Sequence, residues 1–207
     1  MQIIGHRGWW SEEIPKNSRQ ALEECFRRGF GTETDVRDFD GQLVIAHDMV
    51  ESSATPMLLT ELLEVYSRYK EPGTLALNVK SDGLAEAIAR EIETYNLSNY
   101  VLFDMSVPDM LSYRRQGLNY LVRVSEYETI CQELLTPCGI WLDGFVSDWF
   151  MSDFIDEAIN DEIPIYIVSS ELHRRDPKEL WKRLSGYRES DITICTDWPE
   201  SAREVLG

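Results

Sequence analysis

Positive charge is scarce in this chain of 207 residues, which has 20 lysine and arginine residues against 37 aspartate and glutamate residues, a net charge of −17. Nucleic acids and anionic membrane surfaces bind proteins through basic patches, so the composition disfavours both as partners. A small anionic substrate stays compatible with this composition, because a few local cations can outweigh the field of the whole chain.

Cysteine is also scarce, and its spacing is typical of neither a metal site nor a redox motif. The four cysteines are Cys25, Cys131, Cys138 and Cys195, and none of them forms a C-x-x-C pair. We interpret them as reduced packing residues. The N-terminus lacks a basic region followed by a long apolar core, and no apolar run approaches the roughly 20 residues of a membrane span. These absences predict a cytoplasmic protein without membrane insertion, and they leave the oligomeric state open.

What the sequence does have is a regular alternation of short apolar runs and amphipathic patterns. Strands are expected at 2–5, 32–36, 74–79, 100–103, 119–124, 139–143, 163–168 and 191–195. Helices are expected after each of them, at 18–28, 59–69, 84–95, from about 108, around 126–135, at 154–159, after 176–177 and from 199. The dipeptide Asp40-Gly41 predicts a tight turn into a hairpin strand at 42–46.

Alternating strands and helices imply a parallel sheet with helices outside it. Eight such units without a linker or a change of composition predict one compact (β/α)₈ TIM barrel, a single domain over residues 1–207 with a small hairpin after its second strand. An open doubly wound sheet is the alternative, but no G-x-G-x-x-G follows the first strand. Polar residues at the ends of several strands also favour a barrel.

Reactive side chains concentrate in the first 48 residues, which contain two of the three histidines. Glu33 and Asp35 lie on the same face of the second strand, because side chains in a strand alternate with period 2. Two carboxylates that both point into a barrel repel each other unless a cation lies between them. Oxygen ligands at this spacing suit Mg²⁺ or Ca²⁺. The structural alternative is a solvated face of an edge strand.

Histidines and cations flank this pair of acids in the sequence. His6 follows the first strand, and His47 ends the hairpin strand with Asp48 beside it to orient the ring. Two histidines around a metal centre can act as general base and general acid, and Arg7 with Lys80 can neutralise a phosphate. This set suits metal-assisted cleavage of a phosphodiester. The structural alternative is that a strand-end histidine only makes hydrogen bonds and that Asn17 only caps its helix.

The same residues resemble the glycerophosphodiester phosphodiesterase family. The resemblance rests on His6-Arg7-Gly8, Pro15-Lys16-Asn17-Ser18, Glu33-x-Asp35, Asp40-Gly41 and His47-Asp48, with weaker matches at Leu77-Asn78-Val79-Lys80 and Thr196-Asp197-Trp198-Pro199. It implies a (β/α)₈ barrel, a divalent metal on Glu33 and Asp35, His6 and His47 as the acid/base pair, and Arg7 and Lys80 on the phosphate. The implied reaction hydrolyses a glycerophosphodiester to an alcohol and a phosphomonoester such as glycerol 3-phosphate. A lyase that forms a cyclic phosphate, as in related phospholipase-D-like toxins, stays open.

This chain departs from the family pattern in two places. The family usually has an acid two residues before the third-strand lysine as a third metal ligand, where this chain has Asn78. The amide oxygen can still bind a metal, but one negative charge is lost, and Asp104 or Asp143 could compensate. The capping insertion that many members carry after the His-Asp motif is also missing, which predicts a more open pocket. A non-catalytic barrel that binds a phospho-ligand is therefore kept as an alternative.

Overall fold

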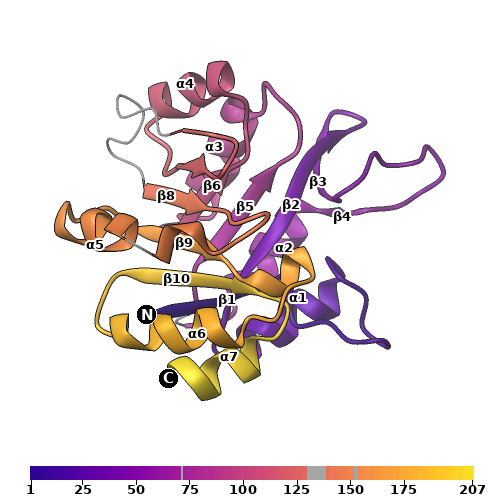
Figure 1. Ribbon diagram of the computed structural model, residues 1–207. Helices are drawn as coiled ribbons and strands as arrows, with labels where there is room; N and C mark the ends of the chain where they lie inside the picture. Colours follow the sequence, from indigo (N-terminus) through magenta and orange to yellow (C-terminus); the bar gives the residue numbers. More distant parts are fainter. Residues whose placement is uncertain (71, 130–138, 152) are drawn as a thin grey trace.

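The computed structural model describes residues 1–70, 72–129, 139–151 and 153–207 (Figure 1). Eight parallel strands form its centre, and a short hairpin arm extends from one of them (Figure 1). The eight strands are β1 (Gln2–His6), β2 (Gly31–Phe39), β5 (Leu75–Val79), β6 (Tyr100–Phe103), β7 (Leu121–Val124), β8 (Gly139–Leu142), β9 (Ile165–Val168) and β10 (Ile192–Thr196).

The strands are joined into a ring. Going round from β1, the parallel pairs are β1 with β2, β2 with β5, β5 with β6, and, on the other side, β1 with β10, β10 with β9, β9 with β8 and β8 with β7. A parallel bridge between Leu102 and Tyr120 joins β6 to the start of β7, and the Leu102 backbone N–H donates to the Asn119 carbonyl at 3.0 Å. The ring of strands is the arrangement expected of a (β/α)₈ barrel, so the prediction of this fold is confirmed.

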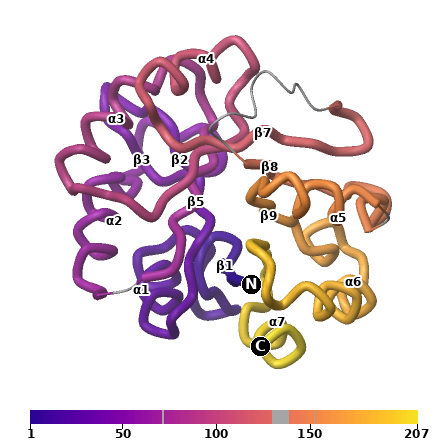
Figure 2. The backbone as a smooth tube through the Cα atoms, turned by 90° about the vertical axis from the view of Figure 1, so that its left-hand side faces the viewer, coloured from indigo at the N-terminus to yellow at the C-terminus, as the bar shows by residue number. Residues whose placement is uncertain are grey.

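Helices surround the ring in chain order (Figure 2). They are α1 (Arg19–Arg27), α2 (Leu59–Tyr66), α3 (Ala85–Thr94), α4 (Val107–Arg115), α5 (Asp153–Asn160), α6 (Lys178–Leu184) and α7 (Pro199–Leu206), with short 3₁₀ segments η2 (Trp149–Met151), η3 (Ser170–His173) and η4 (Ser185–Tyr187). In the described ranges, every helix is too short or too polar to span a bilayer. The helix expected around 126–135 falls largely outside the described residues; at its expected start, residues 126–127 form a turn that is closed by a bridge between Ser125 and Glu128.

Local sequence signals explain where these helices begin. The Ser18 side chain caps α1 by accepting a hydrogen bond from the Ala21 backbone N–H at 3.1 Å. Pro199 occupies the first turn of α7, where a missing N–H costs nothing. α1 packs beside β2, and α7 packs beside β1, near the N-terminus (Figure 2).

The hairpin arm follows the second barrel strand, as predicted. β2 pairs antiparallel with β3 (Gln42–Ile45), which pairs antiparallel with β4 (Met57–Leu58). Asp40 and Gly41 form the turn with φ values of 50° and 75°, a conformation that favours glycine and asparagine or aspartate. The Ala46 backbone N–H donates to the Asp35 carbonyl at 3.1 Å, so the chain leaving β3 runs beside the end of β2.

The barrel interior is apolar and holds stacked aromatic rings. The Phe103 and Trp141 rings stack with centroids 3.7 Å apart, and Tyr166 continues the stack from Trp141. Ile4, Ala76 and Cys195 are buried in the same cluster. A second apolar layer fills the space between strands and helices. The interior cluster forms a floor beneath the carboxyl ends of the strands, where the polar side chains lie.

Candidate active site

Strand register brings the predicted site residues of β1, β2 and β5 to the same face. His6 lies opposite Glu33, and Asp35 lies opposite Asn78 in the parallel pairs. Residues at the same level of neighbouring parallel strands point to the same side of a sheet, here the barrel interior. Arg7 continues from β1 with φ at 60°, and its backbone N–H donates to the Glu33 carbonyl at 2.9 Å. Main-chain pairing therefore holds these five positions next to one another.

His6 is oriented by an acid from the last strand. Its Nδ1 atom lies 2.7 Å from Oδ1 of Asp197, which directly follows β10. Burial pushes the pKa of Asp197 upward, but the hydrogen bonds and charges of His6 and Lys16 outweigh it and keep that pKa below its ordinary value. An ionised carboxylate only accepts hydrogen bonds, so Nδ1 of His6 carries the proton and Nε2 is the atom free for proton transfer. Nε2 lies 3.9 Å from Oε2 of Glu33.

Asp197 receives two further donors. The Trp10 Nε1–H donates to its Oδ1 at 3.0 Å, and the Lys16 ammonium lies 3.0 Å from both carboxylate oxygens. Its backbone N–H donates to the buried carboxylate of Glu171, which also accepts from Thr196 Oγ1. The sequence motif contains Asp197, but sequence reasoning gave this residue no role. The signal that could have found it is that a second acid at a barrel strand end can orient a strand-end histidine.

Glu33 is an acid held in an apolar setting, with a side chain only 2% exposed. Burial is the main reason that its pKa rises from the ordinary 4.5 to about 7, and the negative charge of Asp35 adds to the rise. His6, Arg7 and Lys80 oppose it with their positive charge. A bound cation beside Glu33 would favour the ionised form, so this electrostatic setting suits a metal ligand.

Asp35 is fully buried and surrounded by donors. Its Oδ2 lies 3.0 Å from Nε of Arg7 and accepts a hydrogen bond from Nδ2 of Asn17 at 2.8 Å, while its Oδ1 lies 3.2 Å from Nζ of Lys80. The two predicted phosphate-binding cations are thus present, and both face Asp35. Neither Arg7 Nε nor Asp35 Oδ1 has a partner in hydrogen-bond geometry, so these two contacts are ion pairs without a directed bond.

Asn17 has a different role from helix capping. Ser18 is the capping residue of α1, whereas Asn17 has φ at 59° and lies across the end of β2. It donates to Asp35 and accepts from Thr34 Oγ1 at 2.8 Å. The alternative that Asn17 only caps its helix is therefore wrong, because its left-handed backbone turns the amide toward the barrel.

Oxygen donors for a divalent cation are present at this centre. Asn78 Oδ1 is buried and has no hydrogen-bond partner, and Asn78 is the register neighbour of Asp35. Within the described ranges, no three histidine, cysteine or acidic side chains come together as a metal-binding group. Glu33, Asp35 and Asn78 nevertheless form the kind of oxygen-only donor set that Mg²⁺ and Ca²⁺ use, and one oxygen each of Asp35 and Asn78 accepts no hydrogen bond. These residues fit such a cation.

His47 lies apart from this group. Its side chain is 44% exposed, and its Nδ1 is 2.8 Å from Oδ1 of Asp48, an acid that is 92% exposed. The Arg37 guanidinium donates to the His47 carbonyl at 3.1 Å. In the described part of the chain, no hydrogen bond or ion pair joins His47 to His6 or Glu33. The predicted contact with Asp48 is confirmed, and the hydrogen bond from Ala46 to Asp35 places the residue before His47 beside the end of β2.

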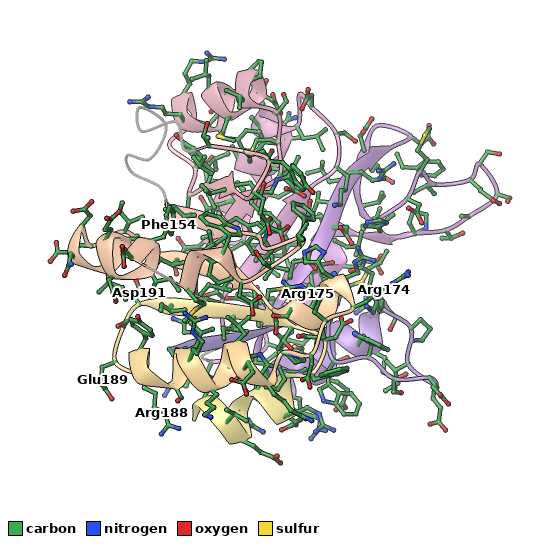
Figure 3. All side chains as sticks on the ribbon, in the orientation of Figure 1. Phe154, Arg174, Arg175, Arg188, Glu189 and Asp191 are labelled. Carbon is green, nitrogen blue, oxygen red and sulfur yellow. The ribbon has the colours of Figure 1, made fainter. Side chains whose placement is uncertain are left out.

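A second acid–histidine pair lies on the far side of the barrel mouth. Nε2 of His173, in η3, is 2.6 Å from Oδ1 of Asp143, which follows β8, and burial raises the pKa of Asp143. The loop that carries His173 is tied down by Arg175, whose guanidinium contacts Asp148 Oδ1 at 2.7 Å and donates to the Gly144 carbonyl at 2.6 Å. Figure 3 shows Arg174 and Arg175 on the side of the barrel toward which the hairpin arm projects. Asp143, which the sequence offered as a possible substitute for the missing acid at Asn78, is thus already paired with His173.

The fold and the site together define a class of protein: an eight-stranded barrel whose strands carry acids, a histidine and cations at their carboxyl ends. The fold is similar to that of a candidate glycerophosphodiester phosphodiesterase from Galdieria sulphuraria, with a TM-score of 0.75 and 16% identity over 99% of this chain and 97% of that one. A glycerophosphodiester phosphodiesterase from Agrobacterium tumefaciens matches with a TM-score of 0.68 and 15% identity over 98% of this chain and 99% of that one.

A Ca²⁺-dependent phosphatidylinositol-specific phospholipase C from Streptomyces antibioticus is more distant, with a TM-score of 0.56 and 10% identity over 100% of this chain and 96% of that one. No protein-family model matches the sequence, and no curated protein matches it either. At these identities the likeness shows a shared fold, and the resemblance that the sequence motifs indicated is confirmed at that level. Since one barrel fold carries many activities, function has to be argued from the site.

Proposed function

We propose that this chain is a metal-dependent phosphodiesterase that hydrolyses glycerophosphodiester-type substrates to an alcohol and a phosphomonoester such as glycerol 3-phosphate. The observation that carries the proposal is the juxtaposition of His6, oriented by Asp197, with two buried acids and two cations at one barrel mouth. General acid/base groups, a cation site and positive charge for the phosphoryl oxygens are the parts that phosphodiester hydrolysis needs.

Glu33, Asp35 and Asn78 are the residues that would hold Mg²⁺ or Ca²⁺. Such a cation, when bound, neutralises phosphoryl charge and acts as a Lewis acid. Arg7 and Lys80 then bind phosphoryl oxygens, because both already lie at the carboxyl ends of β1 and β5 with their charged groups directed at the same centre. Their positive charge stabilises the additional negative charge of the transition state.

His6 moves a proton at its Nε2 atom. Asp197 holds the opposite ring nitrogen, fixes the tautomer and stabilises the ring when it becomes positively charged. His47 is the proposed second acid/base residue. Support for this role comes from the hydrogen bond between Ala46 and Asp35, which keeps the preceding residue at the edge of the centre. The two histidines divide the removal of a proton from the nucleophile and its donation to the leaving alcohol.

The activity can be tested with glycerophosphodiesters that differ in the alcohol, each incubated with the full chain and either Ca²⁺, Mg²⁺ or a chelator. Release of glycerol 3-phosphate that requires the cation is the expected result, and His6→Ala should abolish it. His173→Ala is a matched control that removes the third histidine of the chain without touching the proposed proton path. Wild-type turnover by both His6→Ala and His47→Ala would refute the assignment.

Two alternatives have distinct readouts in the same samples. A non-catalytic phospho-ligand-binding barrel, which the amide at Asn78 favours, would bind glycerol phosphate tightly in calorimetry and release no product. A lyase would give a cyclic phosphate, which phosphorus NMR separates from a phosphomonoester at once.

A further inference from the structure

A chain of alternating charges crosses the barrel mouth from β2 to β7. Lys80 lies between two acids, with Nζ at 3.2 Å from Asp35 Oδ1 and 3.8 Å from Asp104 Oδ2. The other oxygen of Asp104 lies 2.7 Å from Nη1 of Arg123. Arg123 is in turn held by both oxygens of Glu128, at 2.6 and 2.9 Å. Lys80 is thus the one link in this chain that contacts both the proposed centre and a second, anchored acid.

Asp104 is placed by strained backbone and a fixed partner. It follows β6 with φ at 74°, a conformation that residues other than glycine rarely adopt. Such outliers persist where the surrounding structure holds them, and they gather at functional positions. The bond to Arg123 fixes the carboxylate, because Arg123 itself is clamped by Glu128. An acceptor for an ammonium group is therefore ready beside Lys80.

A divalent cation bound to Asp35 would add to two positive charges that already lie beside its carboxylate. Arg7 and Lys80 both form ion pairs with this carboxylate. Because Asp35 is buried, the cation and these two side chains would repel one another strongly. Of these two, Lys80 has a second acid within 4 Å in the described structure, and its flexible stem allows the ammonium to move. A short shift of the ammonium toward Asp104 relieves the repulsion and keeps Lys80 at the mouth.

We propose that Asp104 is a positioning residue that receives the Lys80 ammonium when Asp35 binds a divalent cation. The inference rests on the proposed function, because it takes the cation site as given. It gives Asp104 a different role from that of a substitute metal ligand. The charge lost at Asn78 is made up outside the ligand set, by an acid that withdraws a competing cation from Asp35 and leaves the ammonium available for a phosphoryl oxygen.

The test is a double-mutant cycle on divalent-cation affinity, measured by calorimetry with Ca²⁺ or Mg²⁺ alone and the full-length chain. Asp104→Asn should weaken binding about fivefold or more. Lys80→Met should bind the cation more tightly than wild type, since the competing ammonium is gone. In the Lys80→Met background, adding Asp104→Asn should change affinity less than about twofold, because no ammonium is left to be received.

Asp148→Asn is the matched control, because Asp148 is an acid of similar exposure that also pairs with an arginine at 2.7 Å, here Arg175, and in the described residues no ion pair joins it to Lys80. It should leave cation affinity within about twofold of wild type. A thermal melt of each variant verifies folding. Equal losses from Asp104→Asn in both backgrounds would overturn the inference, since they would show a simple charge effect. No loss in either background, with wild type binding the cation and turning over substrate, overturns the inference alone. A wild type that binds neither cation overturns it together with the proposed metal site.

Discussion

The Nδ1 atom of His6, at the end of the first strand, lies 2.7 Å from Oδ1 of Asp197, at the end of the last strand. Closure of the barrel between β1 and β10 makes this contact possible across 191 positions of sequence. The contact gives the histidine a defined tautomer and a counter-charge, and these are the two properties that an acid/base residue needs.

Replacement of Asp197 by asparagine should lower kcat about 100-fold or more and change KM little, because it removes the charge that stabilises the protonated His6 ring. Steady-state kinetics on a glycerophosphodiester measures this. Asp48→Asn is the matched control, since Asp48 contacts His47 in the same way but is 92% exposed. This variant should change kcat less than about threefold. Equal losses in the two variants would contradict the role given to Asp197.

Glu33→Gln should stabilise the metal-free protein at pH 8 and leave its stability at pH 4 almost unchanged. The folded state raises the pKa of Glu33 from 4.5 to about 7, so it binds the proton more tightly than the unfolded chain does. The stability that this proton contributes to the folded state is fully present below pH 4.5 and is lost as the pH rises through about 7. Glutamine does not ionise, so the variant avoids this loss of stability. Its free energy of unfolding at pH 8 should exceed that of wild type by about 1–3 kcal/mol.

Urea denaturation of wild type and Glu33→Gln at both pH values, with a chelator present, measures this gain. Ca²⁺ should then raise the unfolding free energy of wild type more than that of the variant, since a bound ligand stabilises only the state that binds it. A variant that is less stable than wild type at pH 8 would show that Glu33 is ionised and well paired in the folded protein.

Asn78→Asp should raise affinity for Ca²⁺ or Mg²⁺ about tenfold or more, because it adds a carboxylate to the donor set. The same change should destabilise the metal-free protein, since it places another charge beside the buried Asp35. Calorimetry and thermal melts report the two effects separately. Asn78→Ala, which removes the amide oxygen, should weaken binding, and equal affinity of both variants would argue against a ligand at this position.

Glu171→Ala should destabilise the fold by about 2–4 kcal/mol and lower kcat in addition. Its buried carboxylate accepts from Ser169 Oγ, from Thr196 Oγ1 and from the Asp197 backbone N–H, and alanine leaves these donors without partners. Glu171→Gln keeps the shape and should cost less. If the alanine variant melted like wild type, these hydrogen bonds would not hold the end of β10 in place.

Sequence patterns predicted the fold well because its determinants are local. Alternating apolar runs, the Asp40-Gly41 turn and a capping serine each act within a few residues, and the strands and hairpin lie within a few positions of their expected places. The acids of β2 were also predictable, since period-2 alternation puts Glu33 and Asp35 on one face. The extent of the single domain, the localisation and the oligomeric state stay predictions.

The partners of the site residues were not predictable in the same way. The contact of His6 with Asp197 depends on closure of the barrel, and that of Asn17 with Asp35 depends on a left-handed backbone angle. The sharing of Lys80 between two acids depends on where β5 and β6 end in space. Such relationships arise from tertiary geometry, and single-residue preferences contain little information about them.

The most direct test of the account is a crystal structure of the wild-type chain soaked with Ca²⁺ and glycerol 3-phosphate. We expect the cation on carboxylate and amide oxygens of Glu33, Asp35 and Asn78 at about 2.3–2.6 Å, with phosphate oxygens beside Arg7 and Lys80. His6 should keep its bond to Asp197 and present Nε2 to the phosphate. A cation bound elsewhere, or a phosphate away from the ends of β1, β2 and β5, would contradict the central claim that these strand ends form one phosphodiesterase centre.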